Sequence, residues 1–182
     1  MKRAAIWSIL LAGTVWAAIA QAPRVTRAAL RSLEQSFDKR VLTLNAESPF
    51  ELLGTTRGVY LEGYGAVLTA EVNLMVTMNL TPFQSTIPKP YIVKVHAQKR
   101  QRLPVLKRSM QEALIATAAS LDTVPSNEQV AVGVSLFYYK WEDTSGLPSQ
   151  IVMRAERQKL LDVQLGHVDR SALDSIVQVK EL

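Results

Sequence analysis

The 182-residue chain contains no cysteine and only two histidines, and both scarcities limit the sites that it can hold. Without cysteine it has no disulfide framework and no acylation site of a lipoprotein, so its stability must come from the core. His96 and His167 have no second histidine at i+3 or i+4, and the HExxH and DxDxDG spacings are absent. The sequence therefore predicts no metal and no other cofactor.

Glycine and proline number 8 each, which excludes a collagen-like or low-complexity chain. Gly58, Gly63 and Gly65 lie close together, but no lysine follows as in a phosphate-binding loop. A dinucleotide-binding fingerprint would need glycine at position 68, which is Leu68, and a helix where a strand pattern follows. The glycines instead favour a hairpin turn at residues 62–65.

The first twenty residues have the pattern of a signal peptide. Lys2 and Arg3 precede seventeen uncharged and predominantly apolar residues, and small residues then allow cleavage after Ala20 or Ala22. We therefore expect an exported bacterial protein in the periplasm or the medium. The alternative is that the segment is retained as a membrane anchor, although seventeen residues are few for a spanning helix.

The remainder predicts an α+β fold with an antiparallel sheet and amphipathic helices packed on one face. Residues 21–45 form an amphipathic helix and residues 46–182 a single domain. The apolar stripe of that helix is Leu30, Leu33, Phe37, Val41 and Leu44.

Alternation of apolar and polar residues over 66–80 predicts one long strand with a bend or bulge. Residues 91–121 are predicted to be mostly helical, with 92–102 ambiguous and Pro104 either beginning or kinking the helix. The later elements are strands at 130–138 and 150–155, a short helix ending near Gly166, and a helical turn followed by a terminal strand.

Positive charge is concentrated in one segment. The chain carries +5, whereas residues 89–108 alone carry +7 with no acidic residue. Within this basic block Lys99, Arg100 and Arg102 are candidates to bind an acidic partner or anionic lipid headgroups. The competing interpretation is an ordinary solvated helix face, and export argues against nucleic acid as a partner.

Aromatic residues are the other binding candidates. Phe137, Tyr139 and Trp141 alternate along the strand predicted at 130–138 and its continuation. If that face is open, they form a platform for sugar or peptide; if it is covered, they belong to the core. Tyr60 and Tyr64, beside the glycine turn, are candidates as well.

The hypothesis that these features favour is an exported, non-enzymatic domain that binds a protein or another envelope component. Its membrane contact would be transient, through the signal segment. One alternative is a small periplasmic hydrolase that uses Glu62, Glu142, Asp143 and a histidine, although the usual Gly-x-Ser-x-Gly elbow is absent. The other is a membrane-anchored subunit that keeps its N-terminal segment.

Overall fold

The computed structural model describes residues 25–44, 49–78, 80 and 86–182. The predicted signal segment, residues 1–20, lies outside these ranges. Among the helices described, none combines the length and the apolar character needed to cross a membrane.

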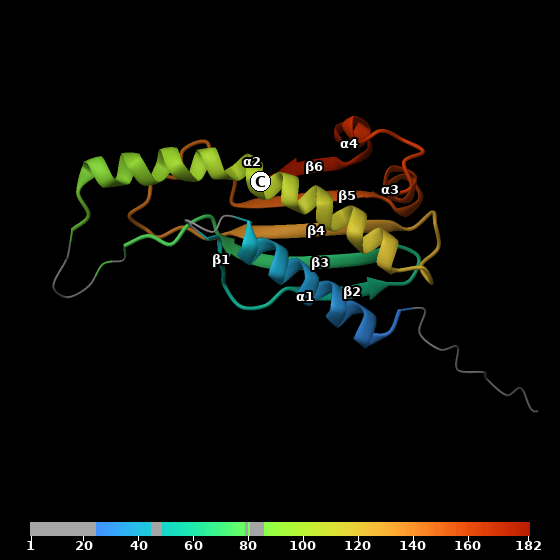
Figure 1. Cartoon of the computed structure of the whole chain (residues 1–182). Coiled ribbons are helices and arrows are strands. Elements are labelled where there is room, and N and C mark those ends of the chain that lie inside the picture. Colours follow the sequence, from blue (N-terminus) through green and yellow to red (C-terminus); the bar gives the residue numbers. More distant parts are fainter. Residues whose placement is uncertain (1–24, 45–48, 79, 81–85) are drawn as a thin grey trace, which may run out of the picture.

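The described chain forms two layers, a six-stranded sheet and helices laid across one of its faces (Figure 1). β1 and β2 both pair with the outer side of β3, and β4, β5 and β6 follow in that order. The strands are β1 (Glu51–Leu52), β2 (Arg57–Leu61), β3 (Gly65–Asn73), β4 (Gln129–Leu136), β5 (Gln150–Glu156) and β6 (Gln178–Glu181). The helices are α1 (Arg27–Thr43), α2 (Lys89–Ser120), α3 (Arg157–Gln164), the 3-10 turn η1 (Arg170–Ala172) and α4 (Leu173–Ile176).

The α+β class is confirmed, but the prediction of an entirely antiparallel sheet is wrong at one pair. β3 and β4 are parallel, with Gly65 opposite Gln129 and Val72 opposite Leu136. The reason is the connection between them: α2 carries the chain back to the end where β3 began, so β4 starts in the same direction. Parallel neighbours require a crossover of this kind.

The long strand predicted over residues 66–80 is shorter than expected. Ala66, Leu68, Val72 and Leu74 are buried on the helix side, as the alternation predicts. β3 nevertheless ends at Asn73, and the chain leaves the sheet in a bend. The period-two pattern continues in the sequence past the point where a neighbouring strand is present to pair with it.

The apolar stripe predicted for α1 is buried apart from Leu44, which is half-buried, and α2 buries an apolar face as well. In α1, Leu33, Phe37 and Val41 are buried, and the Thr26 side chain caps the helix by accepting from the N–H of Ala29 at 3.2 Å. α2 is continuous through Pro104, so the ambiguous segment 92–102 is helical. At 1.5 Å per residue its 32 residues extend about 48 Å.

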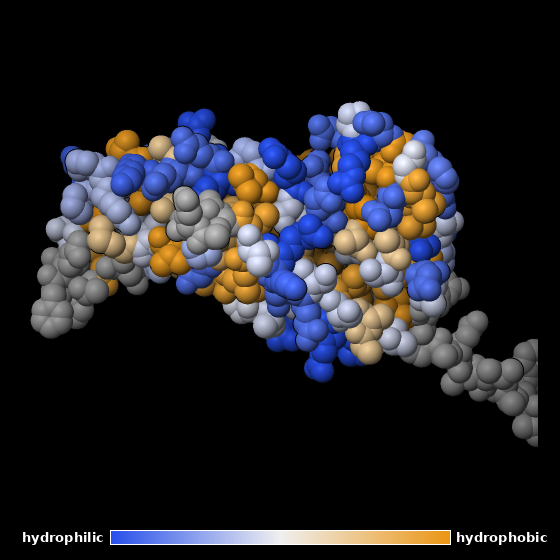
Figure 2. Space-filling view, in the orientation of Figure 1, coloured by the Kyte–Doolittle hydropathy of each residue, from blue (hydrophilic) through white to orange (hydrophobic). Residues whose placement is uncertain are grey.

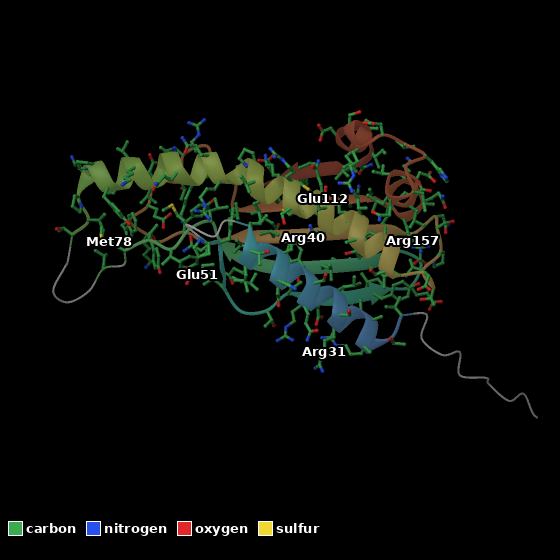
Figure 3. The ribbon with its side chains drawn as sticks, viewed as in Figure 1. Arg31, Arg40, Glu51, Met78, Glu112 and Arg157 are labelled. Atoms are coloured by element: carbon green, nitrogen blue, oxygen red, sulfur yellow. The ribbon has the colours of Figure 1, made fainter. Side chains whose placement is uncertain are left out.

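The buried residues of α2 pack on alternate residues of the central strands. Leu106, Met110 and Leu114 meet Val130 and Val132 in one continuous apolar core. At the far end, the buried Arg157 guanidinium donates to the carbonyl oxygens of Ala118 at 3.0 Å and of Val124 at 2.9 Å (Figure 3). These bonds satisfy main-chain acceptors where the helix ends.

The outer edge of β2 is covered by an ion pair from α1. The N–H of Gly58 donates to Glu34 Oε1 at 2.7 Å, while Arg27 pairs with Glu34 at 2.7 Å and donates to the Gly58 carbonyl at 3.3 Å. Burial raises the pKa of Glu34, but the hydrogen bonds from Arg27 and Gly58 outweigh it, so this pKa lies below its usual range. The N–H and C=O of Gly58, which point away from β3, are therefore hydrogen-bonded to side chains of α1.

The glycine turn is the hairpin corner that the sequence predicts. Tyr64 N–H donates to the Leu61 carbonyl at 3.0 Å, and Gly63 and Gly65 have φ of +79° and +129°. Gly65 also meets β4 closely, because a Cβ there would lie 1.9 Å from the carbonyl oxygen of Gln129. The residue thus serves the turn and the first contact of the parallel pair together.

We expect Gly65→Ala to lower the free energy of unfolding by at least about 4 kcal/mol, because the methyl group collides with backbone at a positive φ. Gly54→Ala is the matched control: φ is +95°, but nothing lies within 4 Å of the added Cβ. It should cost only about 1–2 kcal/mol. Urea denaturation of both variants checks this, and equal losses would contradict the role given to Gly65.

Candidate functional site

One end of the molecule projects beyond the sheet. β3 and β4 end at Asn73 and Leu136, whereas the N-terminal half of α2 continues outward (Figure 1). Two other segments accompany it. We call residues 74–78, 89–102 and 137–149 the arm.

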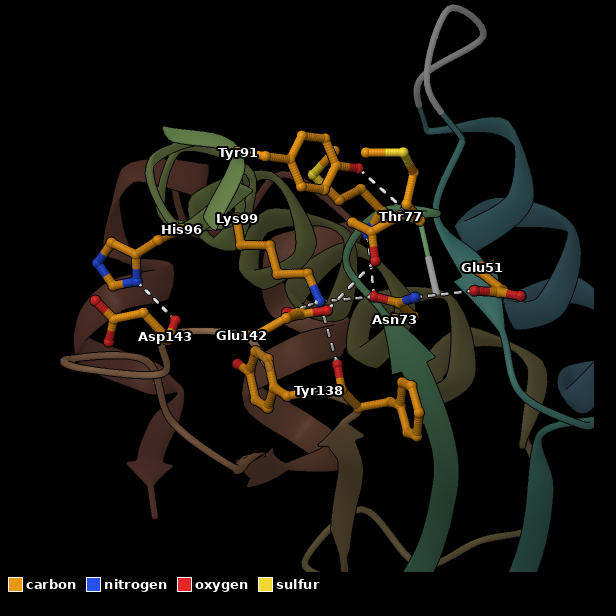
Figure 4. Close-up of polar contacts among 12 residues, drawn as sticks. Glu51, Asn73, Thr77, Tyr91, His96, Lys99, Tyr138, Glu142 and Asp143 are labelled. Atoms are coloured by element: carbon orange, nitrogen blue, oxygen red, sulfur yellow. Dashed lines mark hydrogen bonds and ion pairs between the residues drawn. The ribbon is translucent and has the colours of Figure 1, made fainter. Parts of the chain in front are cut away.

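A buried ion pair lies where the arm joins the sheet (Figure 4). Lys99 Nζ is 2.6 Å from Glu142 Oε2, and the two side chains are 0% and 1% exposed. Nζ also donates to Asn73 Oδ1 at 2.9 Å and to the Phe137 carbonyl at 3.4 Å, and it lies 4.9 Å from the centre of the Tyr138 ring. The ammonium therefore joins α2, the end of β3 and the loop that follows β4.

Further hydrogen bonds orient the groups around this pair. Asn73 uses its amide nitrogen to donate to Glu51 Oε2 at 2.9 Å, which leaves its oxygen for Lys99. The Thr77 hydroxyl donates to Glu142 Oε1 at 3.4 Å. Such second partners matter because a buried carboxylate or ammonium is costly unless its remaining donors and acceptors are satisfied.

Burial shifts the titration of two groups here. Desolvation lowers the pKa of Lys99, and the hydrogen bond and charge of Glu142 oppose that shift. Burial, together with the negative charge of Glu142, raises the pKa of Tyr138 to about 12. A fully buried amine surrounded by acceptors is not accessible to a substrate, so the geometry indicates a structural pair and not a lysine nucleophile.

The aromatic residues 137, 139 and 141 do not lie on a strand face, since β4 ends at Leu136. They are half-buried in the arm and pack on one another. The rings of Phe137 and Tyr139 meet edge to face at 5.0 Å, those of Tyr139 and Trp141 stack at 6.1 Å, and Trp141 lies 5.8 Å from Tyr91 of α2. They lie in the loop that follows β4 and not in the sheet core, and Trp141 joins this row of rings to α2 through Tyr91.

The basic block divides into residues with different environments. Lys99 is buried, so it is not available to a surface partner. The Arg102 guanidinium lies 4.4 Å from the Phe50 ring centre, and burial lowers its pKa. Lys107 pairs with Glu181. The exposed members are Lys89, Lys94, Arg100 and Arg108.

Tyr60 and Tyr64 lie at the opposite end of β3 from the arm. Tyr60 donates to Glu128 Oε1 at 3.3 Å, and Tyr64 is half-buried in the hairpin corner. The nine residues of β3 separate this corner from Asn73 by about 30 Å. The structure therefore divides the predicted binding residues into two groups that cannot share one ligand of ordinary size.

Of the groups named for a hydrolase, Glu142, Asp143 and His96 lie near one another in the arm, whereas Glu62 and His167 lie elsewhere. Glu62 lies in the hairpin corner, the length of β3 away from Glu142, which is committed to Lys99. Asp143 is exposed, and His96 Nδ1 donates to its main-chain oxygen at 2.9 Å and not to its carboxylate. His167 is exposed at the end of α3. Direct proton transfer needs hydrogen-bond reach or one bridging water, and Glu62 is beyond it.

Asn73 and Tyr91 were missed by sequence reasoning, and Lys99 was assigned to the surface. A signal for Lys99 was present: Val95, Lys99, Leu103 and Leu106 follow helical spacing, and all four are buried. A charged residue within an apolar stripe indicates a buried pair. Its partner Glu142 has no comparable signal, because it lies in a loop.

No family model, curated protein or solved structure matches the chain. Within the described ranges, no cluster of histidine and acidic residues has a geometry that could hold a metal ion. What the structure defines is the class, an α+β domain with a mixed sheet and a projecting arm.

We expect Lys99→Met to lower the free energy of unfolding by about 3–5 kcal/mol, because Glu142 is left buried without a counter-charge. The double variant Lys99→Met, Glu142→Leu should recover most of that loss, since no charge then remains to desolvate. Urea denaturation, followed with one spectroscopic probe in the sheet and one in the arm, measures the free energy of unfolding of both variants.

Lys107→Met is the matched control on the same helix. Lys107 and Glu181 are 30% and 39% exposed, so losing that pair should cost at most about 1 kcal/mol. If Lys99→Met were no more damaging than Lys107→Met, the buried pair would not hold the arm.

Proposed function

We propose that this chain is an exported, non-enzymatic envelope domain that binds a protein partner. The arm is the element that contacts this partner. The observation that carries this is a set of exposed apolar side chains on and beside the arm. Val93 is 69% exposed, Val76 62%, Leu80 46% and Met78 43%. Figure 2 shows hydrophobic residues at the surface of the projecting end among hydrophilic ones.

The arm presents these side chains on a braced support. The N–H of Met78 donates to the Tyr91 hydroxyl at 3.2 Å, so α2 holds the 74–78 segment (Figure 4). His96 holds the 137–149 loop through Asp143, and the Lys99 pair anchors all three segments to the sheet. A preformed surface loses less conformational entropy on binding than a flexible one.

Charge indicates the character of the partner surface. Lys89, Lys94 and Arg100 are exposed on the arm helix, and within the described chain no acidic side chain forms an ion pair with them. Opposite charge across an interface steers association and disfavours wrong partners. The partner surface is therefore acidic with apolar residues within it.

We expect Val93→Ser and the charge reversal Lys94→Glu each to weaken partner binding about tenfold, with the fold unchanged. A photo-crosslinking residue at position 93, in the full chain in its native host, identifies the partner, and titration of the purified pair gives the affinities. Leu165→Ser is the matched control, since Leu165 is 65% exposed on the distant α3 end. Crosslinks no more specific at 93 than at 165 would refute the arm as the binding element.

The proposed export is tested by sequencing the N-terminus of the protein isolated from its host. Export with cleavage predicts a mature chain that begins at Gln21 or Pro23, because cleavage is expected after Ala20 or Ala22. If the protein retains Met1 and pellets with membranes, the hypothesis of a cleaved, exported domain is wrong and that of a membrane-anchored subunit takes its place.

A further inference from the structure

The two edges of the sheet are treated differently. On the β2 side, α1 covers the edge, and Glu34 and Arg27 bind the main chain of Gly58. On the other side, all four residues of β6 are exposed, and β5 is the strand with which β6 pairs in the described chain. An open edge is a template for another strand unless something blocks it.

The hydrogen-bond pattern identifies the open groups. Gln150 and Leu182 exchange both main-chain bonds, at 3.2 and 3.0 Å. Because bonded and non-bonded pairs alternate in an antiparallel ladder, Lys180 also faces β5, whereas the N–H and C=O of Val179 and Glu181 face outward. Within the described residues no hydrogen bond engages these four groups.

Hollows lie on both faces beside this edge. The hollow on the helix side, of about 540 Å³, is lined by Pro104, Met153 and Val179 together with polar side chains. Its basic and acidic side chains are equal in number: Lys107 forms an ion pair with Glu181, and Arg108 and Asp174 also line the hollow.

The hollow on the open face of the sheet, of about 580 Å³, is lined in part by Val152, Arg154 and Lys180. It contains two basic side chains and no acidic one. Successive side chains of a strand point to opposite faces. A strand added beside β6 would therefore direct alternate side chains into the two hollows.

We propose that β6 receives an extended segment of a partner protein as an additional strand. Its main chain pairs with Val179 and Glu181, its apolar side chains enter the helix-side hollow, and its acidic side chains face Arg154 and Lys180. This is recognition by strand addition, in which the main chain supplies affinity and alternate pockets supply specificity. The site is separate from the arm and goes beyond the function proposed above.

A second copy of this chain fits the edge less well. The antiparallel register that uses all four outward groups pairs Val179 with Glu181 of the other copy. It places Lys180 directly opposite Lys180 of that copy, where like charges are destabilising. The edge therefore favours an acidic segment over itself.

The test is selection of a phage-displayed library of short random peptides on the full chain. We expect enriched peptides to alternate apolar and acidic residues. Val179→Pro removes one outward N–H and leaves the β5 ladder intact, so binding should fall at least about tenfold. Val179→Thr keeps that N–H and should bind as the wild type does. Arg154→Glu with Lys180→Glu should exchange the acidic preference for a basic one.

Hydrogen exchange on the wild-type chain supplies a readout that needs no variant to fold. A selected peptide should slow exchange at the amides of Val179 and Glu181. The proposal is overturned if no peptide is enriched, or if enriched peptides bind the Val179→Pro variant as tightly as the wild type. It is also overturned if, without peptide, raising the protein concentration protects these amides while the molecular mass doubles, because the edge then pairs with a second copy. Val93→Ser should leave peptide binding unchanged, so failure here and failure of the arm are distinguishable.

Discussion

The buried pair of Lys99 and Glu142 is the interaction on which the projecting end of the molecule depends. In the described part of the chain no strand continues beyond Asn73 and Leu136 for α2 to pack on, and polar contacts and stacked aromatic rings take the place of the apolar core there. A buried pair contributes little net stability, because desolvation offsets the attraction. Its effect is geometric: Nζ finds its acceptors in one arrangement of α2, β3 and the 137–149 loop.

The same asymmetry appears across the sheet. Helices cover one face of the sheet. At the β2 edge α1 supplies Glu34, which binds Arg27 and the main chain of Gly58, whereas at the β6 edge the main-chain N–H and C=O groups of Val179 and Glu181 point outward. Two surfaces of different chemistry follow, an apolar and basic arm and a strand edge with a basic flank. They lie on different elements, so the two partners proposed above would not compete for one surface.

Much of the fold was predictable because its signals are local. The stripe of Leu33, Phe37 and Val41, the burial of Ala66 and Leu68, and the Gly63–Gly65 corner all depend on neighbours within a few residues. The binding candidates were less predictable. Phe137, Tyr139 and Trp141 were placed by their alternation on a strand that ends before them. Burial of Lys99 had a signal in the helical spacing, whereas the identity of its partner had none.

Sequence by itself determined the α+β class, the two amphipathic helices and the hairpin corner, because periodicity and glycine conformation are properties of a short stretch of chain. Only the tertiary structure decided that β3 and β4 run parallel, that β3 stops at Asn73, and that Lys99 meets Glu142. Each of these depends on which distant segment lies alongside. A charged residue is exposed or buried according to whether that segment brings an opposite charge.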